Sequence, residues 1–299
     1  MAKIVLKELA FRNGEPYANS QYYVTGDYHL HYRIDEAKGV EKAKMFMIHG
    51  FGCNTTFFDE LVEHYTRAGI KCVRVDLPDF GFSTRELKGI RFVPQVKMLF
   101  ELMDFLDTDQ SGWILLGHSM GGSVVLELAN EDDSRFNAII LNAPLLMFNV
   151  PAWLGKIIMV KPMRVFMDKA LAFLLPYDWA FKVAEFLMTV DPVYSRKFDA
   201  KKFIDAFSVK YTGSALCYMT SNTTAPDLKE LHKIKAPCQL VTGTADLFVF
   251  PSKSEALRNA LPAGFDDHKI KHGGHCFLQC RSEETAQLAL DFLKKNDII

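Results

Sequence analysis

Features that are scarce or missing in this sequence of 299 residues exclude several classes of protein. No stretch of about 18 uncharged apolar residues occurs, so we expect no membrane-spanning helix. The formal net charge is only −1, which leaves no basic excess to neutralise the phosphates of a nucleic acid. The six cysteines are too few to suggest a disulfide framework, and the charged N-terminus lacks the apolar core of a secretory signal. These absences together predict a cytoplasmic protein that binds no nucleic acid.

Short apolar runs alternate with helical patterns along most of the chain. The apolar runs predict strands over 44–50, 70–81, 112–118, 137–144, 236–246 and 268–274. The helical patterns predict helices over 55–69, 92–107, 120–130, 252–262 and 282–295. Residues 20–35 alternate in hydrophobicity around Gly26 and Asp27, which is typical of a β-hairpin. The alternation of strands and helices predicts an α/β fold, with a mostly parallel central sheet and helices on both faces.

The alternation stops at Pro144 and resumes near Lys235. Residues 144–225 show helical periodicity and no clear strand, so we predict a helical insertion there, in a core formed by residues 1–143 and 226–299. The insertion contains six of the twelve methionines and two of the three tryptophans. Such residues suit an apolar acyl pocket with a face that touches lipid surfaces, and they equally suit packing of the insertion on the core. Both interpretations remain open at this stage.

The stretch LLGHSMGGSVVLE, residues 115–127, contains the pattern Gly-x-Ser-x-Gly between an expected strand and an expected helix. A nucleophile on the loop after a parallel strand lies where such sheets place their ligands. Its side chain projects outward only if the turn is sharp, and Gly117 and Gly121 allow the strand and the helix to approach closely there. The context therefore predicts that Ser119 is a nucleophile rather than a residue of a structural turn.

A serine hydroxyl needs a general base, and that base needs an acid to orient it. The segment KHGGHCF offers His272 and His275 after the last expected strand, and we favour His275 because it follows two glycines and lies on the loop. The acid is expected at the end of an earlier strand. Asp246 occupies such a position, whereas the other candidate strand ends at Asn142 and supplies no carboxylate there.

Acyl transfer also requires N–H donors for the oxyanion of the tetrahedral intermediate. One donor is expected from Met120, the residue after the nucleophile. The other is expected from the loop HGFGCNTT, in which Gly50 lets the backbone turn so that the Phe51 N–H faces the site. We expect His49 to stabilise this loop by hydrogen bonding rather than to take part in the chemistry.

Five short motifs, HGFG, DLPDFGFS, GHSMGG, TGTAD and GGHCF, follow one another in this order. Together they resemble the α/β-hydrolase superfamily, in its serine-nucleophile branch of esterases and monoglyceride lipases. The resemblance covers nearly all of the chain outside the insertion, and it implies that residues 144–225 form a cap over the site. It also implies these roles: Ser119 as nucleophile, His275 as base, Asp246 as orienting acid, and the N–H groups of Phe51 and Met120 as oxyanion donors.

We expect a serine hydrolase that cleaves carboxylic esters with an apolar acyl group, of the monoacylglycerol type, through an acyl-enzyme. A carbon–carbon bond hydrolase or perhydrolase is the alternative among enzymes, and a non-catalytic small-molecule binding protein is the alternative from another class. No cofactor is required. The spacing of His272, His275, Cys276 and Cys280 is not a usual zinc pattern, so we predict no metal. The oligomeric state stays open.

Overall fold

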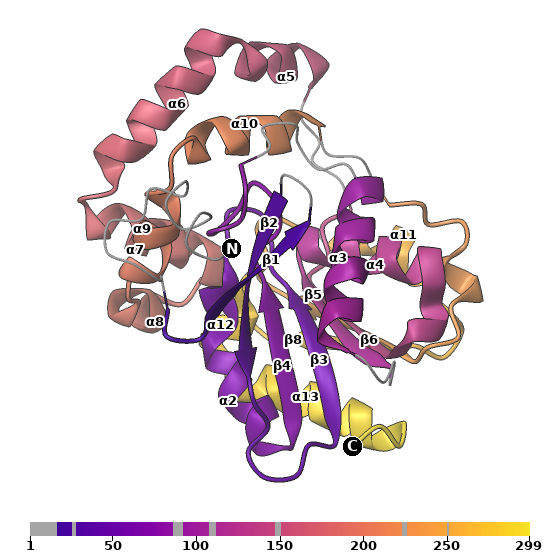
Figure 1. The fold of residues 1–299 in the computed structure, drawn as a ribbon. Helices are drawn as coiled ribbons and strands as arrows, with labels where there is room; N and C mark the ends of the chain where they lie inside the picture. Colours follow the sequence, from indigo (N-terminus) through magenta and orange to yellow (C-terminus); the bar gives the residue numbers. More distant parts are fainter. Residues whose placement is uncertain are drawn as a thin grey trace.

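The computed structural model describes residues 17–25, 28–85, 92–107, 112–146, 151–222, 226–249 and 251–299. These residues contain an eight-stranded sheet in the order β1-β2-β4-β3-β5-β6-β7-β8 (Figure 1). Strand β2 pairs antiparallel with both β1 and β4, and all the pairs from β4 to β8 are parallel. The predicted α/β fold with a mostly parallel sheet is confirmed. The strands are β1 (Ser20–Thr25), β2 (Tyr28–Asp35), β3 (Ala43–Ile48), β4 (Ile70–Val75), β5 (Trp113–His118), β6 (Phe136–Asn142), β7 (Cys238–Gly243) and β8 (Asp266–Ile270).

The central strands are apolar on both faces because helices cover both sides of the sheet. In β3, Phe46 and Ile48 pack in the cluster that includes α3, α4 and α11, whereas Met45 and Met47 pack in the cluster that includes α2 and α13. Successive side chains of a strand point to opposite faces, so an uninterrupted apolar run fills two cores at once. The helices of the core are α2 (Asp59–Arg67), α3 (Phe92–Leu106), α4 (Met120–Asp132), α11 (Pro251–Ala260), α12 (Phe277–Cys280) and α13 (Ser282–Lys295).

Several boundaries differ from those predicted. The strand expected over 268–274 ends at Ile270, so residues 271–274 form a loop before the short helix α12. The helix expected from Thr55 begins as a 3₁₀ turn, η1 (Thr55–Phe58), in which the side chain of Asn54 accepts the N–H of Thr56. The hairpin is present as β1 and β2, and its expected turn at Gly26 and Asp27 lies outside the described residues.

No strand occurs in the described residues between β6 and β7. The α-helices there are α5 (Ala152–Met159), α6 (Lys161–Leu174), α7 (Asp178–Thr189), α8 (Pro192–Lys197), α9 (Lys201–Phe207) and α10 (Thr212–Asn222), and the 3₁₀ turn η3 (Leu231–Lys233) follows them. We call these six helices, residues 151–222, the helical insertion. In Figure 1, α10 lies between the carboxyl edge of the sheet and the helices α5 and α6, while α7, α8 and α9 lie to the side of the sheet. None of the described helices is long and apolar enough to cross a bilayer.

Polar contacts join the insertion to the core at several points. The backbone oxygen of Lys202 accepts Nδ2 of Asn54 at 3.1 Å, and Nζ of Lys202 lies 3.2 Å from Asp59 and 3.0 Å from Glu60 on α2. Arg85, on the loop after β4, donates to the hydroxyl of Thr212 at 3.0 Å. The half of the insertion near α2 is therefore joined to the core by charged and neutral hydrogen bonds.

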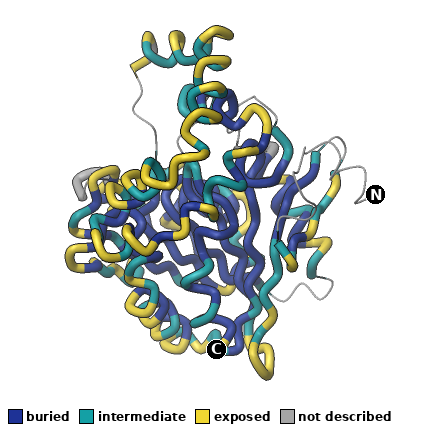
Figure 2. Tube along the Cα trace, turned by 90° about the vertical axis from the view of Figure 1, so that its left-hand side faces the viewer, coloured by how far each residue is buried: buried dark blue, intermediate teal, exposed yellow. Residues whose placement is uncertain are grey.

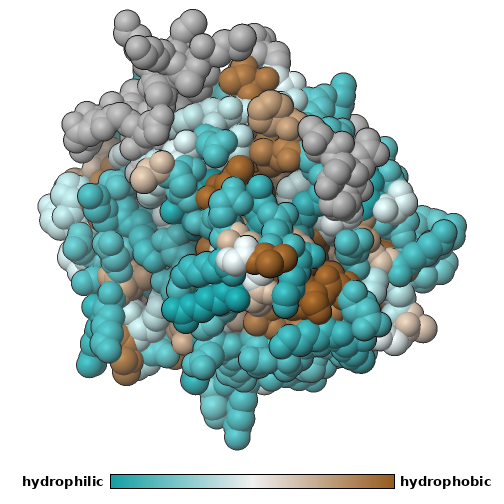
Figure 3. All heavy atoms as spheres, turned by 60° about the horizontal axis from the view of Figure 1, so that its bottom comes forward, coloured by the Kyte–Doolittle hydropathy of each residue, from teal (hydrophilic) through white to brown (hydrophobic). Residues whose placement is uncertain are grey.

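Burial is uneven across the molecule. The sheet and the helices next to it are buried, whereas the outlying helices are mostly exposed (Figure 2), and α6 has no buried residue. The face opposite the insertion is mostly hydrophilic, with a few hydrophobic patches (Figure 3). Most of the exposed large apolar side chains of the described residues belong instead to the insertion.

Candidate active site

Ser119 lies at the carboxyl end of β5, immediately before α4. Its backbone has φ 53° and ψ −120°, a conformation that residues other than glycine rarely adopt. The turn is fixed by hydrogen bonds on both sides of the peptide: the N–H of Ser119 donates to the carbonyl of Asn142, and the carbonyl of Ser119 accepts the N–H groups of Gly122 and Leu145, each at 2.9 Å. The strained backbone is thus stabilised by α4, by the end of β6 and by the segment that follows β6.

Two glycines permit the close approach of strand and helix around this turn. A Cβ atom on Gly117 would lie 2.6 Å from the carbonyl oxygen of Gly121, and a Cβ atom on Gly121 would lie 2.2 Å from the carbonyl oxygen of Ile48. Both distances are far below van der Waals contact, so a larger residue would force α4 away from the sheet. The geometry gives a physical reason for glycine at the two positions that the sequence singled out.

A continuous chain of hydrogen bonds connects Ser119, His275 and Asp246. Nε2 of His275 lies 2.8 Å from Oγ of Ser119, and Nδ1 of His275 lies 2.8 Å from Oδ2 of Asp246. The three residues are 3%, 3% and 6% exposed, so little water competes for these bonds. The other oxygen of Asp246 accepts the N–H groups of Phe248 and Val249, both at 2.8 Å, which fixes the carboxylate. The structure therefore brings the three residues together in the expected order.

Neither of the two alternatives left by the sequence, His272 and the end of β6 at Asn142, takes part in this chain of side-chain hydrogen bonds. His272 is exposed, has a positive φ of 58°, and donates its backbone N–H to Thr244 rather than contacting Ser119. Asn142 ends β6 and contributes only its backbone carbonyl to the serine turn, because its side-chain atoms have no partner among the described residues.

The loop after β3 lies against the serine. A Cβ atom on Gly50 would come 2.9 Å from Cβ of Ser119, which shows how closely the two backbones approach. The carbonyl of Gly50 accepts Nδ1 of His49 at 2.7 Å and the N–H of Cys53 at 3.2 Å. A trans peptide directs its C=O and N–H to opposite sides. Because the Gly50 carbonyl points to His49 and Cys53, the N–H of Phe51 points away from them.

Met120 contributes the second backbone group near the serine. It is the first residue of α4, where an N–H has no partner within the helix. The positive end of a helix dipole also lies there, which favours negative charge next to the Ser119 side chain.

Two buried histidines next to the site, His118 and His49, serve as hydrogen-bonding groups. Burial, reinforced by the neighbouring His275, holds the pKa of His118 well below its ordinary value, and Nε2 of His118 lies 3.0 Å from the carbonyl oxygen of His275. Burial likewise lowers the pKa of His49, whose Nε2 accepts the N–H of Leu77 at 3.2 Å. The expected role of His49 in stabilising its loop agrees with these contacts.

Asp76 connects the loop after β3 with the loop after β4. Its carboxylate accepts the N–H groups of Thr55 and Phe82 and pairs with Nδ1 of His31 at 2.7 Å. Burial opposes ionisation, but His31 and these hydrogen bonds outweigh it and keep the pKa of Asp76 below its usual value. A side chain on Gly81, at φ 48°, would overlap this carboxylate. These contacts give Asp76 a structural role that joins the two loops.

Comparison with known proteins assigns the family. The family model of the serine aminopeptidases, S33, matches residues 39–279. The chain belongs to this family of α/β-hydrolases. This S33-family chain is 29% identical to the monoglyceride lipase of Rattus norvegicus, over 92% of its own length and 89% of the lipase. It is 25% identical to the monoacylglycerol lipase ABHD6 of Homo sapiens, over 89% of its own length and 80% of that protein.

Solved structures show the same fold at lower identity. The enol-lactonase from Burkholderia xenovorans LB400 superposes on the S33-family chain with a TM-score of 0.72 at 19% identity, covering 92% of this chain and 100% of the lactonase. A thermophilic esterase from Thermogutta terrifontis gives a TM-score of 0.70 at 17% identity, covering 93% of this chain and 99% of the esterase. Within the described ranges, no group of three or more His, Cys, Asp or Glu residues is arranged to hold a metal ion.

Sequence reasoning missed two features of the site in this α/β-hydrolase. Phe248, which is 46% exposed, lies with its ring centroid 5.6 Å from that of His275. Gly274 packs against α7, because a Cβ atom there would lie 2.5 Å from the carbonyl carbon and oxygen of Thr189. The position of Phe248 two residues after Asp246 was the available signal for the first contact. No signal in the sequence pointed to the second.

Proposed function

We propose that this protein is a serine hydrolase that cleaves carboxylic esters with an apolar acyl group, of the monoacylglycerol type. The observation that carries the proposal is the hydrogen-bonded chain from Ser119 through His275 to Asp246, on a strained turn at the carboxyl edge of a parallel sheet. The similarity to the rat monoglyceride lipase, over most of both chains, favours a lipid ester as the substrate.

In the proposed acylation step, Oγ of Ser119 attacks the carbonyl carbon of the ester and its proton passes to Nε2 of His275. Asp246 orients the imidazole through Nδ1 and stabilises the imidazolium that forms. The carbonyl oxygen becomes an oxyanion, for which the N–H groups of Phe51 and Met120 are the proposed donors. When the intermediate collapses, the bond to the alcohol oxygen breaks and His275 returns the proton to that oxygen, leaving an acyl group on Ser119.

Deacylation repeats these steps with water as the nucleophile. His275 takes a proton from the water molecule as its oxygen attacks the acyl carbon. The same two N–H groups stabilise the second oxyanion. The carbon–oxygen bond to Ser119 then breaks, His275 returns the proton to Oγ, and a free carboxylic acid leaves. No cofactor or metal takes part in the proposed reaction.

We further propose that residues 144–225 act as a cap over the site, on a core of residues 1–143 and 226–299. The position of α10, between the carboxyl edge of the sheet and the outer helices α5 and α6, supports this division (Figure 1). Exposed apolar side chains on α5 and α6, such as Trp153, Phe166 and Phe173, stand beside basic residues and suit a transient contact with a lipid surface.

The test is hydrolysis of p-nitrophenyl esters from acetyl to palmitoyl and of a monoacylglycerol, by the wild type and by Ser119→Ala. We expect Ser119→Ala to lose nearly all activity, by a factor of about 10⁴ or more. Ser134→Ala, a change at an exposed serine away from the site, should leave it intact. Activity that survives in Ser119→Ala would refute the proposal.

The substrate panel also separates the other reactions. A vinylogous diketone tests carbon–carbon bond hydrolysis, hydrogen peroxide with a short carboxylic acid tests perhydrolysis, and an aminoacyl anilide tests peptidase activity. A protein that turns over none of these, yet binds a monoacylglycerol, would be a binding protein of the same fold.

A further inference from the structure

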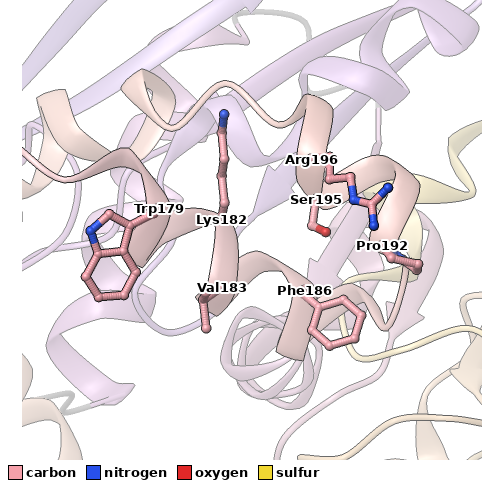
Figure 4. A pocket seen from close by; sticks show the side chains of 7 residues that line it. All are labelled: Trp179, Lys182, Val183, Phe186, Pro192, Ser195 and Arg196. Atoms are coloured by element: carbon pink, nitrogen blue, oxygen red, sulfur yellow. The ribbon is translucent and has the colours of Figure 1, made fainter.

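An open groove lies on the surface of the helical insertion between α7 and α8, away from the chemistry proposed above (Figure 4). Its volume of about 450 Å³ is within the ~300–1,000 Å³ range of small-molecule sites. One face of each helix lines it, at the spacing that brings helical side chains onto the same side. The lining residues are Trp179, Lys182, Val183 and Phe186 on α7, and Pro192, Ser195 and Arg196 on α8.

The floor and walls of the groove are apolar and exposed. Trp179 is 62% exposed, Val183 is 51% exposed and Phe186 is 41% exposed. All three lie side by side along α7. Apolar residues that form a continuous exposed surface, rather than standing singly, mark a site where something binds.

The polar groups of the groove are one hydroxyl and two cations. Ser195 is only 5% exposed, and its Oγ makes no hydrogen bond to any described residue. Neither Arg196 nor Lys182 forms an ion pair within the part of the chain that the structure describes, and no carboxylate is among the lining residues. The nearby Asp191 is already engaged, because its Oδ1 accepts the N–H groups that open α8.

The side chains are arranged so that polar and apolar parts are separate. Figure 4 shows Ser195 and Arg196 together on the α8 side, next to Phe186, with Val183 and Trp179 further along α7. A guanidinium group binds a carboxylate through two parallel hydrogen bonds, and a hydroxyl can donate a third. An apolar trough that continues from these donors fits a hydrocarbon chain.

We propose that this groove is a binding site for one long-chain carboxylate, separate from the catalytic site. The carboxylate accepts hydrogen bonds from Arg196 and Ser195, and the hydrocarbon chain lies over Phe186, Val183 and Trp179. The aliphatic stem of Lys182 adds apolar surface while its charge favours the anion. The ligand belongs to the class of acid that the proposed reaction releases, but its binding here requires no turnover and no part of Ser119.

Trp179 makes the site observable. In Ser119→Ala combined with Trp153→Phe, the remaining tryptophans are Trp179, in the groove, and Trp113, which is 3% exposed. We expect laurate, added below the concentration at which it forms micelles, to change the Trp179 emission saturably. Dodecanol and dodecylammonium, which have the same chain without the negative charge, should bind at least tenfold more weakly. Since the variant carries no nucleophile, the result does not depend on whether the ester-hydrolase proposal holds.

Substitutions locate the contact. In the same background, Arg196→Gln should weaken laurate binding at least tenfold, and Val183→Asp, which places a like charge in the trough, should abolish it. The matched control is Lys197→Gln, which removes the neighbouring exposed cation of α8 that does not line the groove. Its dissociation constant for laurate should stay within twofold of that of the background.

Three outcomes would overturn the proposal. One is a similar affinity for laurate and dodecylammonium, which would show that the charge is not recognised. Another is an equal loss in Arg196→Gln and Lys197→Gln, which would indicate general electrostatic attraction. The third is a Trp179 response to anionic phosphatidylglycerol vesicles but not to laurate, which would assign the surface to a membrane instead.

Discussion

The backbone carbonyl of Met188 accepts the N–H of Cys276 at 2.9 Å. Met188 lies near the end of α7 in the helical insertion, and Cys276 directly follows His275. The insertion therefore directly contacts the loop that carries His275, the proposed base. Changes in α7 should reach the site through this contact.

Gly274→Ala tests that coupling. The added Cβ would meet the backbone of Thr189 at 2.5 Å, so either α7 or the His275 loop must move. We expect kcat to fall by about tenfold or more, because small displacements of a general base are costly. The control is Gly155→Ala on α5, whose Cβ would make only ordinary contacts, at 3.9 Å, with the side chain of Ser221. Equal kcat values in the two variants would show that the contact does not position His275.

Asp246→Asn should lower kcat by about 10³–10⁴, because an amide no longer stabilises the imidazolium and can favour the wrong tautomer of His275. The KM for a p-nitrophenyl ester should change little, since Asp246 is not expected to touch the substrate. Asp266→Asn is a matched control: Asp266 also pairs with a histidine, His268 at 2.7 Å, but on the surface at β8. The steady-state parameters of both variants check this, and a loss below tenfold in Asp246→Asn would contradict the role.

Glu185 makes stability depend on pH. It is 4% exposed, and its Oε1 has no hydrogen-bond partner among the described residues. Burial, together with the nearby Glu60 and against the attraction of Lys202, raises the pKa of Glu185 to about 8. Between the ordinary value and about 8, the folded state holds a proton that the unfolded state has lost. The free energy of unfolding should therefore fall as pH rises through this window, by at most about 1.4 kcal/mol per pH unit.

Glu185→Gln should remove this dependence of stability on pH, because the glutamine side chain has no carboxyl proton to lose. We expect the stability of this variant relative to the wild type to rise between pH 5 and pH 8, as measured by urea unfolding at each pH. The exposed Glu283→Gln should show a constant difference from the wild type. A difference that stays constant for Glu185→Gln as well would show that Glu185 is ionised in the folded protein.

The proposed contact with a lipid surface predicts that the exposed aromatic residues of the insertion contribute to binding of lipid vesicles. Phe166 and Phe173 of α6 are 61% and 68% exposed. Replacing both with serine should reduce severalfold the fraction of protein that floats with phosphatidylcholine vesicles, because each substitution removes apolar area that the interface would bury. Activity on a soluble acetyl ester should not change. Phe105→Ser, at a 59% exposed position on α3 of the core, is the control, and an equal loss of flotation there would argue against docking through α6.

The sequence predicted the positions of Ser119, His275 and Asp246 because each follows a strand, and the parallel strands end at one edge of the sheet. Their hydrogen bonds agree with that expectation, while their catalytic roles remain predictions. The apolar strands were predictable for a related reason, since residues of β3 must fill both cores.

Other features depend on contacts between segments far apart in the chain. The approach of Gly274 to Thr189 spans 85 positions and leaves no local pattern. Glu185 reads as a solvent-facing residue of an amphipathic helix, and only the packing of α7 on the core buries it. The prediction extended the last strand to residue 274, but β8 ends at Ile270, and the positive φ of His272, 58°, is incompatible with an extended strand.

The hydrogen bond from the Leu145 N–H to the Ser119 carbonyl has a consequence for how this protein could diversify. Leu145 lies where the chain leaves the core for the insertion, so the backbone of Ser119 fixes where the insertion starts. The hydrogen bonds of the Ser119 backbone are with Asn142, Gly122 and Leu145, whereas the His275 loop also contacts α7 through Met188. A graft that joins a foreign insertion after Leu145 and before β7 should therefore keep the Ser119 turn, but it should keep the His275 loop in place only if it also supplies an acceptor for the Cys276 N–H.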